Sequence, residues 1–285
     1  MARHFGNAPP ALAMDARIGL FKDISLARGE LHAWFVRLED VRRHVDSLVK
    51  ILTPNEIARA DRFFFENDRI EYILARGLLR HIVSRYVGFA PDQLRFGYNS
   101  HGKPALEDEW RGDQLEFNLS HARGWVVYAL TKARCVGVDL EYTDRSIEID
   151  QIAERFFSPY EASLFQQLPG QEKKRAFFSC WTRKEAYVKA RGEGLSLDLR
   201  GFDVTIAPDQ PALLLRVAGD PSEARRWSLT DLPAPAGYAA ALAMEGRIDE
   251  IQLWQWPERS HGRADDTSTW FNQRLSCEEI PDEGL

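Results

Sequence analysis

The residues with the clearest chemical potential lie on one predicted helix, within the stretch 177–199. Trp181, Glu185 and Lys189 recur every four residues, so a helix would place them on one face. Gly192 follows them, and glycine readily adopts the left-handed conformation that ends a helix. A glutamate and a lysine one turn apart often form only a surface ion pair, so this helix alone indicates no particular chemistry.

A second group of candidate residues lies on a predicted strand within the stretch 136–143. Asp139 and Glu141 alternate with valine and leucine, which is the period of a strand, and both acids would project from the face opposite the apolar residues. Two neighbouring carboxylates repel each other. They are tolerated either at a solvated edge or around a hard cation. Mg²⁺ prefers oxygen ligands and shares one or two carboxylates with substrate phosphates, whereas the lack of a neighbouring His or Cys makes zinc the poorer choice.

The order of these motifs along the chain resembles that of the 4′-phosphopantetheinyl transferases of the Sfp type. The resemblance covers roughly residues 50 to 205 and depends on several motifs in sequence, because any one of them is common by chance. The motifs are Gly102-Lys103-Pro104, Phe117-Asn118-Leu119-Ser120-His121, Gly137-Val138-Asp139-Leu140-Glu141, Arg155-Phe156-Phe157-Ser158, the run Trp181 to Lys189, and Gly194-Leu195-Ser196-Leu197.

The resemblance implies an Mg²⁺-dependent enzyme that transfers the 4′-phosphopantetheine arm of coenzyme A to a serine of an apo acyl or peptidyl carrier protein, releasing 3′,5′-ADP. Such a step needs a cation on the pyrophosphate, a proton acceptor for the serine, and a positive group near the leaving oxygen. Asp139, Glu141 and Glu185 are the expected metal ligands. Glu185 is also the expected base, and Lys189 is expected to stabilise the leaving group.

The resemblance also implies a set of contacts to coenzyme A, at Arg59, Lys103, Ser120, His121, Lys184 and Lys189. From the residues alone, Lys103 is better interpreted as an exposed lysine in a hairpin turn, and only the resemblance favours a phosphate contact. Lys184 could equally be a second phosphate contact or a structural neighbour. The sequence departs from the family in two places, because Glu56 and Glu71 stand where relatives can carry basic residues that grip the 3′-phosphate.

Two other functions stay open at this point: a metal-dependent coenzyme A or nucleotide pyrophosphohydrolase, which would use water in place of serine, and a non-catalytic coenzyme A sensor. A sensor would not need the base Glu185. The segment Thr143 to Tyr160 is the candidate docking surface for the carrier protein, with Arg145 and Tyr160 as the exposed contacts. Phe156 and Phe157 are expected to pack inward.

The expected fold is α+β, with two pseudo-twofold-related α/β halves and the active site at their interface, as the family resemblance implies. The halves are placed at residues 1–135, including a loose lead-in 1–28, and 136–246, followed by a tail 247–285. A capping box at Thr53 and Glu56 begins a long helix that ends at Gly88. Further helices are expected at 147–155, 159–167 and 174–191, and strands at 31–38, 125–130, 136–141, 202–206, 213–217, 227–229, 238–244 and 250–256. The strands 125–130 and 136–141 are expected to pair with each other.

Composition restricts the class of protein. The chain of 285 residues has a net charge of −6, which argues against a general nucleic-acid binder. Its three widely spaced cysteines fit neither a zinc site nor a disulfide framework and favour a reducing compartment. We find no signal peptide and no segment that could cross a membrane. The expected protein is therefore a cytoplasmic monomer.

Overall fold

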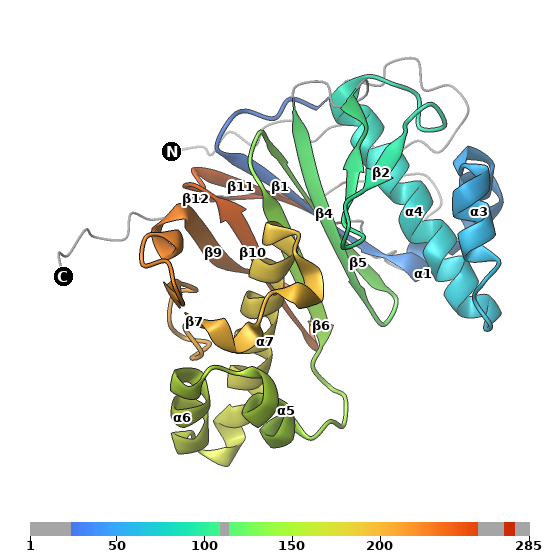
Figure 1. Ribbon diagram of the computed structural model, residues 1–285. Helices are drawn as coiled ribbons and strands as arrows, with labels where there is room; N and C mark the ends of the chain where they lie inside the picture. The colour runs from blue at the N-terminus through green and yellow to red at the C-terminus, as the bar shows by residue number, and fades with distance from the viewer. Residues whose placement is uncertain (1–23, 109–113, 256–270, 277–285) are drawn as a thin grey trace, which may run out of the picture.

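Two β-sheets form the centre of the computed structural model, which describes residues 24–108, 114–255 and 271–276 (Figure 1). Predictions on residues 1–23 and 256–270 lie outside the described residues. One sheet has the order β12-β11-β1-β5-β4 and the other the order β6-β10-β9. Their strands are β1 (Glu30–Arg37), β4 (Leu115–Ala122), β5 (Trp125–Lys132), β6 (Val136–Tyr142), β9 (Trp227–Leu232), β10 (Tyr238–Glu245), β11 (Glu250–Gln255) and β12 (Phe271–Ser276). Two hairpins, β2–β3 (Phe96–Tyr98, Pro104–Leu106) and β7–β8 (Phe202–Val204, Leu214–Val217), lie outside these sheets.

Helices cover the outer faces of both sheets. They are α1 (Leu38–Val41), α2 (Val45–Leu48), α3 (Pro54–Ala60), α4 (Glu66–Val87), α5 (Ile149–Phe156), α6 (Pro159–Gln167) and α7 (Gly170–Arg191). Single turns of 3₁₀-helix are present at Arg42–His44, Val49–Ile51, Gly194–Ser196, Leu199–Gly201 and Glu223–Arg226. Across the described residues, every helix is too short or too polar to span a lipid bilayer.

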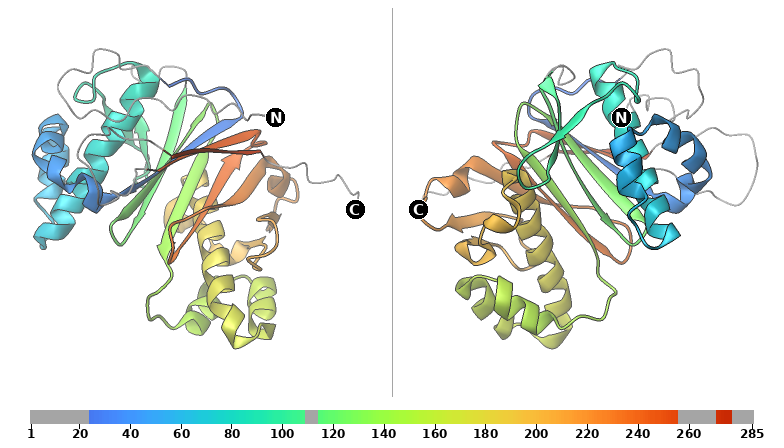
Figure 2. Two further views of the ribbon diagram at one scale, coloured as in Figure 1. Left: turned by 180° about the vertical axis from the view of Figure 1, so that it is seen from behind. Right: turned by 45° about the vertical axis from the view of Figure 1, so that its right-hand side comes forward.

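The layers follow from the alternation of apolar side chains along the strands. On β1, Leu31, Ala33 and Phe35 face the second sheet, whereas Trp34 and Val36 face α4 and its neighbours. Apolar residues of β6 and β10 pack against Leu31, Ala33 and Phe35, so the two sheets pack face to face. Helix α4 then lies outside the first sheet and α7 outside the second (Figure 2). This arrangement of two helix-covered halves confirms the predicted α+β fold.

Helix α7 approaches β6 so closely that a side chain at Gly137 would not fit. A Cβ atom there would lie 2.1 Å from the carbonyl oxygen of Ala186 and 2.2 Å from the backbone nitrogen of Ala190. Both neighbours are backbone atoms of α7, so neither can move aside by changing rotamer. Gly137 therefore sets the distance between β6, which carries Asp139 and Glu141, and the helix that carries Glu185 and Lys189.

Several predicted elements are confirmed. Thr53 and Glu56 form the capping box of α3, and Gly88 and Gly192 end α4 and α7 in the left-handed conformation, with φ of 80° and 70°. The strand predicted at 250–256 is present as β11. It does not belong to a separate tail, because it pairs in parallel with β1 and extends the sheet of the N-terminal half.

Two predictions about neighbouring elements were wrong. The long helix predicted from Thr53 is broken between Ala60 and Glu66, where Phe63, Phe64 and Phe65 are 41%, 91% and 63% exposed. The strands β5 and β6 do not pair with each other. β5 pairs with β1 and β4, whereas β6 pairs with β10, so the chain changes sheets between them.

Candidate active site

The acidic and basic side chains predicted to act together meet where β4, β6 and α7 come side by side. Lys189 on α7 donates to Oδ1 of Asp139 on β6 at 2.6 Å and to Oγ of Ser120 on β4 at 2.8 Å. Ser120 in turn donates to the same Asp139 oxygen at 3.1 Å. A residue from the N-terminal half, Ser120, is thereby joined to two from the C-terminal half.

Glu141 lies on the same face of β6 as Asp139, as the strand period predicted. Its Oε1 accepts a hydrogen bond from Nε1 of Trp181 at 3.1 Å, and its Oε2 pairs with Arg145 at 3.1 Å. Trp181 is one turn before Glu185 on α7, so the predicted helix face of Trp181, Glu185 and Lys189 does face this strand. The side chain of Arg145 is 36% exposed and its guanidinium pairs with Glu141, which weakens its predicted role in docking a carrier protein.

The electrostatics of the carboxylates indicate a site that attracts a cation. Burial raises the pKa of Glu185, and the negative charges of Asp139 and Glu141 raise it further, although Lys189 opposes them. Burial also raises the pKa of Glu141, with Asp139 adding to the effect and Arg145 opposing it. The three carboxylates therefore lie close enough to repel one another electrostatically, and a bound cation would relieve this repulsion.

The donor set fits an oxygen-ligated cation such as Mg²⁺. Oδ2 of Asp139 is buried and has no hydrogen-bond partner among the described residues, so it is available as a ligand. The neighbouring donors Glu141 and Glu185 are also carboxylates, which magnesium prefers to nitrogen or sulfur. Within the described part of the chain, however, no three such side chains already form a group that could enclose a metal ion.

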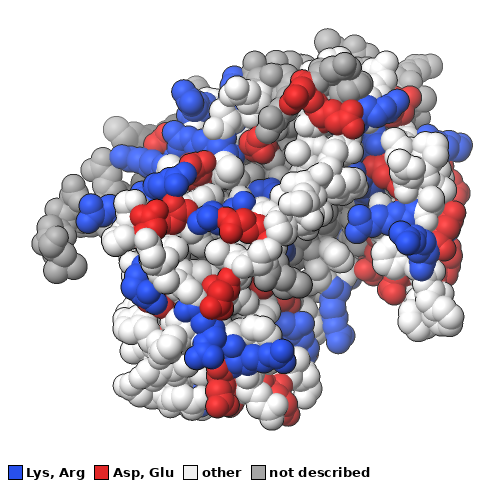
Figure 3. All heavy atoms as spheres, in the orientation of Figure 1, with Lys and Arg blue, Asp and Glu red and all other residues white. Residues whose placement is uncertain are grey.

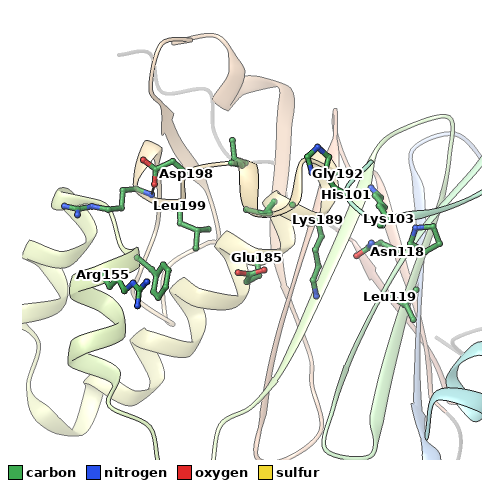
Figure 4. Close-up of a pocket in the computed structure, with 17 residues that line it drawn as sticks. His101, Lys103, Asn118, Leu119, Arg155, Glu185, Lys189, Gly192, Asp198 and Leu199 are labelled. Carbon is green, nitrogen blue, oxygen red and sulfur yellow. Dashed lines mark hydrogen bonds between the residues drawn. The ribbon is translucent and has the colours of Figure 1, made fainter. Parts of the chain in front are cut away.

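A pocket of about 470 Å³ opens beside these residues (Figure 4). Glu185 and Lys189 point into it from α7. The N-terminal half contributes the loop before β3 and residues of β4, and the C-terminal half contributes α5 and the turn after α7. The lining residues are His101, Gly102, Lys103, Pro104, Asn118, Leu119, Arg155, Phe156, Glu185, Val188, Lys189, Gly192, Gly194, Leu197, Asp198, Leu199 and Arg200.

The predicted coenzyme A contacts divide into those near this pocket and those away from it. Lys103 lines the pocket, and its ammonium donates to the carbonyl oxygens of Val136 at 2.9 Å and Ala190 at 3.1 Å. His121 is next to Ser120 on β4, and neither residue is among those that line the pocket. The surrounding protein and the charge of Lys189 lower the pKa of His121, although part of its ring is open to solvent. Arg59 is exposed, lies with its guanidinium 5.7 Å from the ring centre of Tyr72, and is not among the pocket residues.

Of the two roles left open for Lys184, the structure supports the structural one. Its ammonium is fully buried and donates to both carboxylate oxygens of Glu161, at 2.8 and 2.7 Å, and to the carbonyl oxygen of Phe202 at 2.8 Å. All three N–H groups are used, so none is left for a phosphate. Lys184 is one position before Glu185, and the rotation of about 100° between consecutive residues turns its side chain away from the face that carries Glu185.

Glu56 has a structural role that explains its departure from the family pattern. Burial alone would raise the pKa of Glu56, but Arg76, the backbone of Thr53 and Arg80 together bring it below its ordinary value. Its carboxylate closes the capping box of α3 and pairs with Arg76 and Arg80 on α4. An acidic residue at this position thus joins two helices and cannot reach a ligand.

Sequence reasoning missed the role of Asn118. This residue is buried on β4, lines the pocket, and accepts a hydrogen bond from the backbone nitrogen of Val138 at 2.9 Å through its side-chain oxygen. It joins two strands that share no backbone ladder. The signal was available, because asparagine is depleted in strands and therefore suggests a specific hydrogen bond where it occurs in one.

Both halves of the chain match models of one family. Residues 39–133 match the 4′-phosphopantetheinyl transferase, N-terminal, model, and residues 135–243 match the 4′-phosphopantetheinyl transferase superfamily model. The Nostoc sp. 4′-phosphopantetheinyl transferase HetI is 35% identical over 234 residues, covering 82% of this chain and 95% of HetI. The chain belongs to the 4′-phosphopantetheinyl transferase superfamily. Its similarity to the Bacillus subtilis 4′-phosphopantetheinyl transferase Sfp is 30% identity over 164 residues, covering 58% of this chain and 70% of Sfp.

Among solved structures, a crystal structure of Thermotoga maritima holo-[acyl-carrier-protein] synthase covers 50% of this transferase-family chain and 84% of its own chain, with a TM-score of 0.32 and 19% sequence identity. The sequence relatives are named as transferases, so family membership favours the transferase over the pyrophosphohydrolase and the sensor.

Proposed function

We propose that this 4′-phosphopantetheinyl transferase moves the 4′-phosphopantetheine arm of coenzyme A to a serine of an apo acyl or peptidyl carrier protein. The observation that carries the proposal is the meeting of Asp139, Glu141, Glu185 and Lys189 beside a pocket built from both halves. A pyrophosphate-cleaving step needs this combination of carboxylates and a lysine.

In the proposed reaction, the serine hydroxyl attacks the phosphorus that carries the pantetheine arm. The bond from that phosphorus to the bridging oxygen breaks, and 3′,5′-ADP leaves with the electron pair. Glu185, which points into the pocket from α7, accepts the hydroxyl proton. Lys189 uses two of its three N–H groups on Ser120 and Asp139, so the third can donate toward the bridging oxygen.

We assign the metal to Asp139, Glu141 and Glu185. When bound there, Mg²⁺ would neutralise negative charge on the pyrophosphate oxygens. The support for this assignment is the buried, unpartnered Oδ2 of Asp139 and the mutual repulsion of the three carboxylates.

Coenzyme A is proposed to lie along Lys103, Ser120 and His121, with Arg59 near the 3′-phosphate. Lys103 already donates to two backbone carbonyls, so it would act chiefly as a positive charge held in the pocket wall. Arg59 stacks on Tyr72 and has no ion pair among the described residues, which leaves its charge for a ligand.

The carrier protein is proposed to dock beside α5. Arg155 is exposed and lines the pocket, and Phe156 packs edge-on against Trp181 at 5.8 Å. Arg155 therefore replaces Arg145 as the proposed basic contact, because Arg145 is paired with Glu141. On the face shown in Figure 3 acidic and basic side chains are interspersed, so the docking contact would be local.

We further propose a monomer in the cytoplasm, where the thiols of Cys135 and Cys180 would stay reduced.

The test is to incubate the protein with coenzyme A and Mg²⁺, with and without an apo carrier protein. Transfer predicts 3′,5′-ADP only when the carrier is present, together with a carrier mass increased by one phosphopantetheine group. Release of 3′,5′-ADP without carrier would instead show a pyrophosphohydrolase. Coenzyme A binding with no product in either tube would indicate a sensor.

A further inference from the structure

The loop between β2 and β3, residues 99–103, crosses from the N-terminal half to the end of α7. Asn99 donates through its side-chain amide to the carbonyl oxygen of Gly192 at 2.7 Å. Lys103 donates to the carbonyl oxygen of Ala190 at 3.1 Å and also reaches that of Val136 on β6. The last carbonyls of a helix lack partners within the helix, so donors from outside are needed to satisfy them.

The side chain of Asn99 also shapes the loop that carries it. Its Oδ1 accepts hydrogen bonds from the backbone nitrogens of His101 and Lys103, both at 2.9 Å. The backbone closes the same turn, because the backbone nitrogen of Asn99 donates to the carbonyl oxygen of Lys103 at 3.0 Å. One amide side chain therefore folds the loop with its oxygen and attaches the loop to α7 with its nitrogen.

The contact of Asn99 with Gly192 leaves little space for a side chain at the end of α7. A Cβ atom at Gly192 would lie 3.1 Å from Nδ2 of Asn99 and 3.4 Å from Cδ of Lys103, and Gly192 already needs a positive φ of 70°. Figure 4 shows His101 and Gly192 next to each other at the top of the pocket, with Lys189 just below. Lys189 lies within this final turn of the helix, and Glu185 lies one turn earlier.

We infer that Asn99 is a positioning residue, which fixes the end of α7 against the N-terminal half so that Lys189 and Glu185 keep their places beside Asp139. The inference rests on the proposed function for its catalytic consequence, but its structural part is independent of any reaction. It adds a residue outside the recognised motifs to those that set the geometry of the site.

The variant Asn99→Asp tests the inference, because it keeps Oδ1 for the loop and changes only the group that faces Gly192. The ionised carboxylate would repel the carbonyl oxygen and the negative end of the helix dipole. We expect kcat at pH 8 to fall by between about tenfold and a hundredfold, with little change in KM for coenzyme A. When protonated, the same side chain can again donate, so the ratio of variant to wild-type kcat should rise as the pH is lowered toward about 5.

Ser100→Asp is the matched control, because it adds the same charge to the same loop at an exposed side chain that makes no hydrogen bond among the described residues. Hydrogen–deuterium exchange at residues 188–194 gives a readout that needs no activity. We expect faster exchange in Asn99→Asp and wild-type exchange in Ser100→Asp.

Equal exchange in Asn99→Asp and wild type, or equal losses of kcat in the two aspartate variants at every pH, would overturn the inference. If wild-type protein transfers nothing, the proposed function fails, but the exchange measurement still decides the role of Asn99. Should Asn99→Asp not fold, Asn99→Ser takes its place, because it keeps a short acceptor for the loop and is too short to reach Gly192.

Discussion

The ammonium of Lys189 lies 2.6 Å from Asp139 and 2.8 Å from Ser120, so a single side chain on α7 joins β6 of one half to β4 of the other. This ion pair occupies Oδ1 of Asp139 and leaves Oδ2 without a partner among the described residues. The geometry lets Asp139 serve a cation and Lys189 at the same time, through different oxygens.

Asp139→Asn should therefore separate these two tasks. The amide oxygen can still accept from Lys189, but the side chain loses the charge that binds a cation. We expect kcat to fall at least about a hundredfold at millimolar Mg²⁺. We also expect Mg²⁺ to raise the unfolding temperature of the wild type and not of the variant. An Mg²⁺ response retained by Asp139→Asn would show that the metal is held elsewhere.

Glu141→Gln should lower kcat less than Asp139→Asn, because water can take one position of an octahedral site.

Glu185→Gln should lower the rate and leave binding largely intact. The amide cannot accept the serine proton, and loss of general-base catalysis typically costs about 10²- to 10⁴-fold in kcat. Arg59→Ala, Lys103→Ala and His121→Ala should instead raise KM for coenzyme A. Kinetics at saturating coenzyme A, together with a direct binding measurement, distinguish the two classes. The same loss of kcat in all four variants would mean that this division of roles is wrong.

Lys184→Met should destabilise the protein, because it leaves the buried carboxylate of Glu161 without its partner. Both side chains are fully buried, and breaking such a pair costs about 3–5 kcal/mol. Urea unfolding measures this loss. Lys174→Met is the matched control on the same helix, because its pair with Asp144 is largely exposed and should contribute little. Normal stability in Lys184→Met, with a loss confined to coenzyme A binding, would restore the ligand role of Lys184.

The lowered pKa of His81 predicts how the free energy of unfolding depends on pH. Burial lowers the pKa of His81 from 6.5 to about 4, and the charges of Arg85 and His44 add to this effect. The unfolded chain therefore binds a proton below about pH 6.5, whereas the folded protein does not until about pH 4. The stabilising contribution is complete above pH 6.5 and is lost as the pH falls toward 4, a change of about 3 kcal/mol.

His81→Gln should remove this part of the pH dependence. Unfolding free energies of the variant and the wild type, measured by urea titration between pH 7.5 and 4.5, should converge as the pH falls. Parallel curves would show that His81 does not titrate in this range in either state.

The residues that could be placed from sequence are those on regular elements with a clear period. Asp139 and Glu141 were expected on one face of a strand, and Glu185 and Lys189 on one face of a helix, and the structure brings these faces together. Periodicity succeeds here because each pair belongs to a single element whose geometry is fixed by its backbone.

Contacts between residues far apart in the sequence could not be predicted from periodicity. The partner of Lys184 is Glu161, which accepts from that lysine and also from the backbone nitrogens of Ser158 and Val204. Nothing in the local pattern at Lys184 reveals a carboxylate 23 residues earlier. The contact of Asn99 with Gly192 spans 93 residues, and only the packing of the two halves creates it.

The return of β11 to the first sheet has a consequence for how the molecule is assembled. β11 pairs with β1 along its whole length, and Trp254 stacks on Trp34 at 4.9 Å between ring centres. The half that begins the chain is thus completed in space only after residues 250–255 leave the ribosome. Until then β1 would be an open edge, able to pair with a strand of another molecule. β1 is synthesised early, but its neighbour β11 is synthesised late. The N-terminal half is therefore most exposed to aggregation during the time between the two.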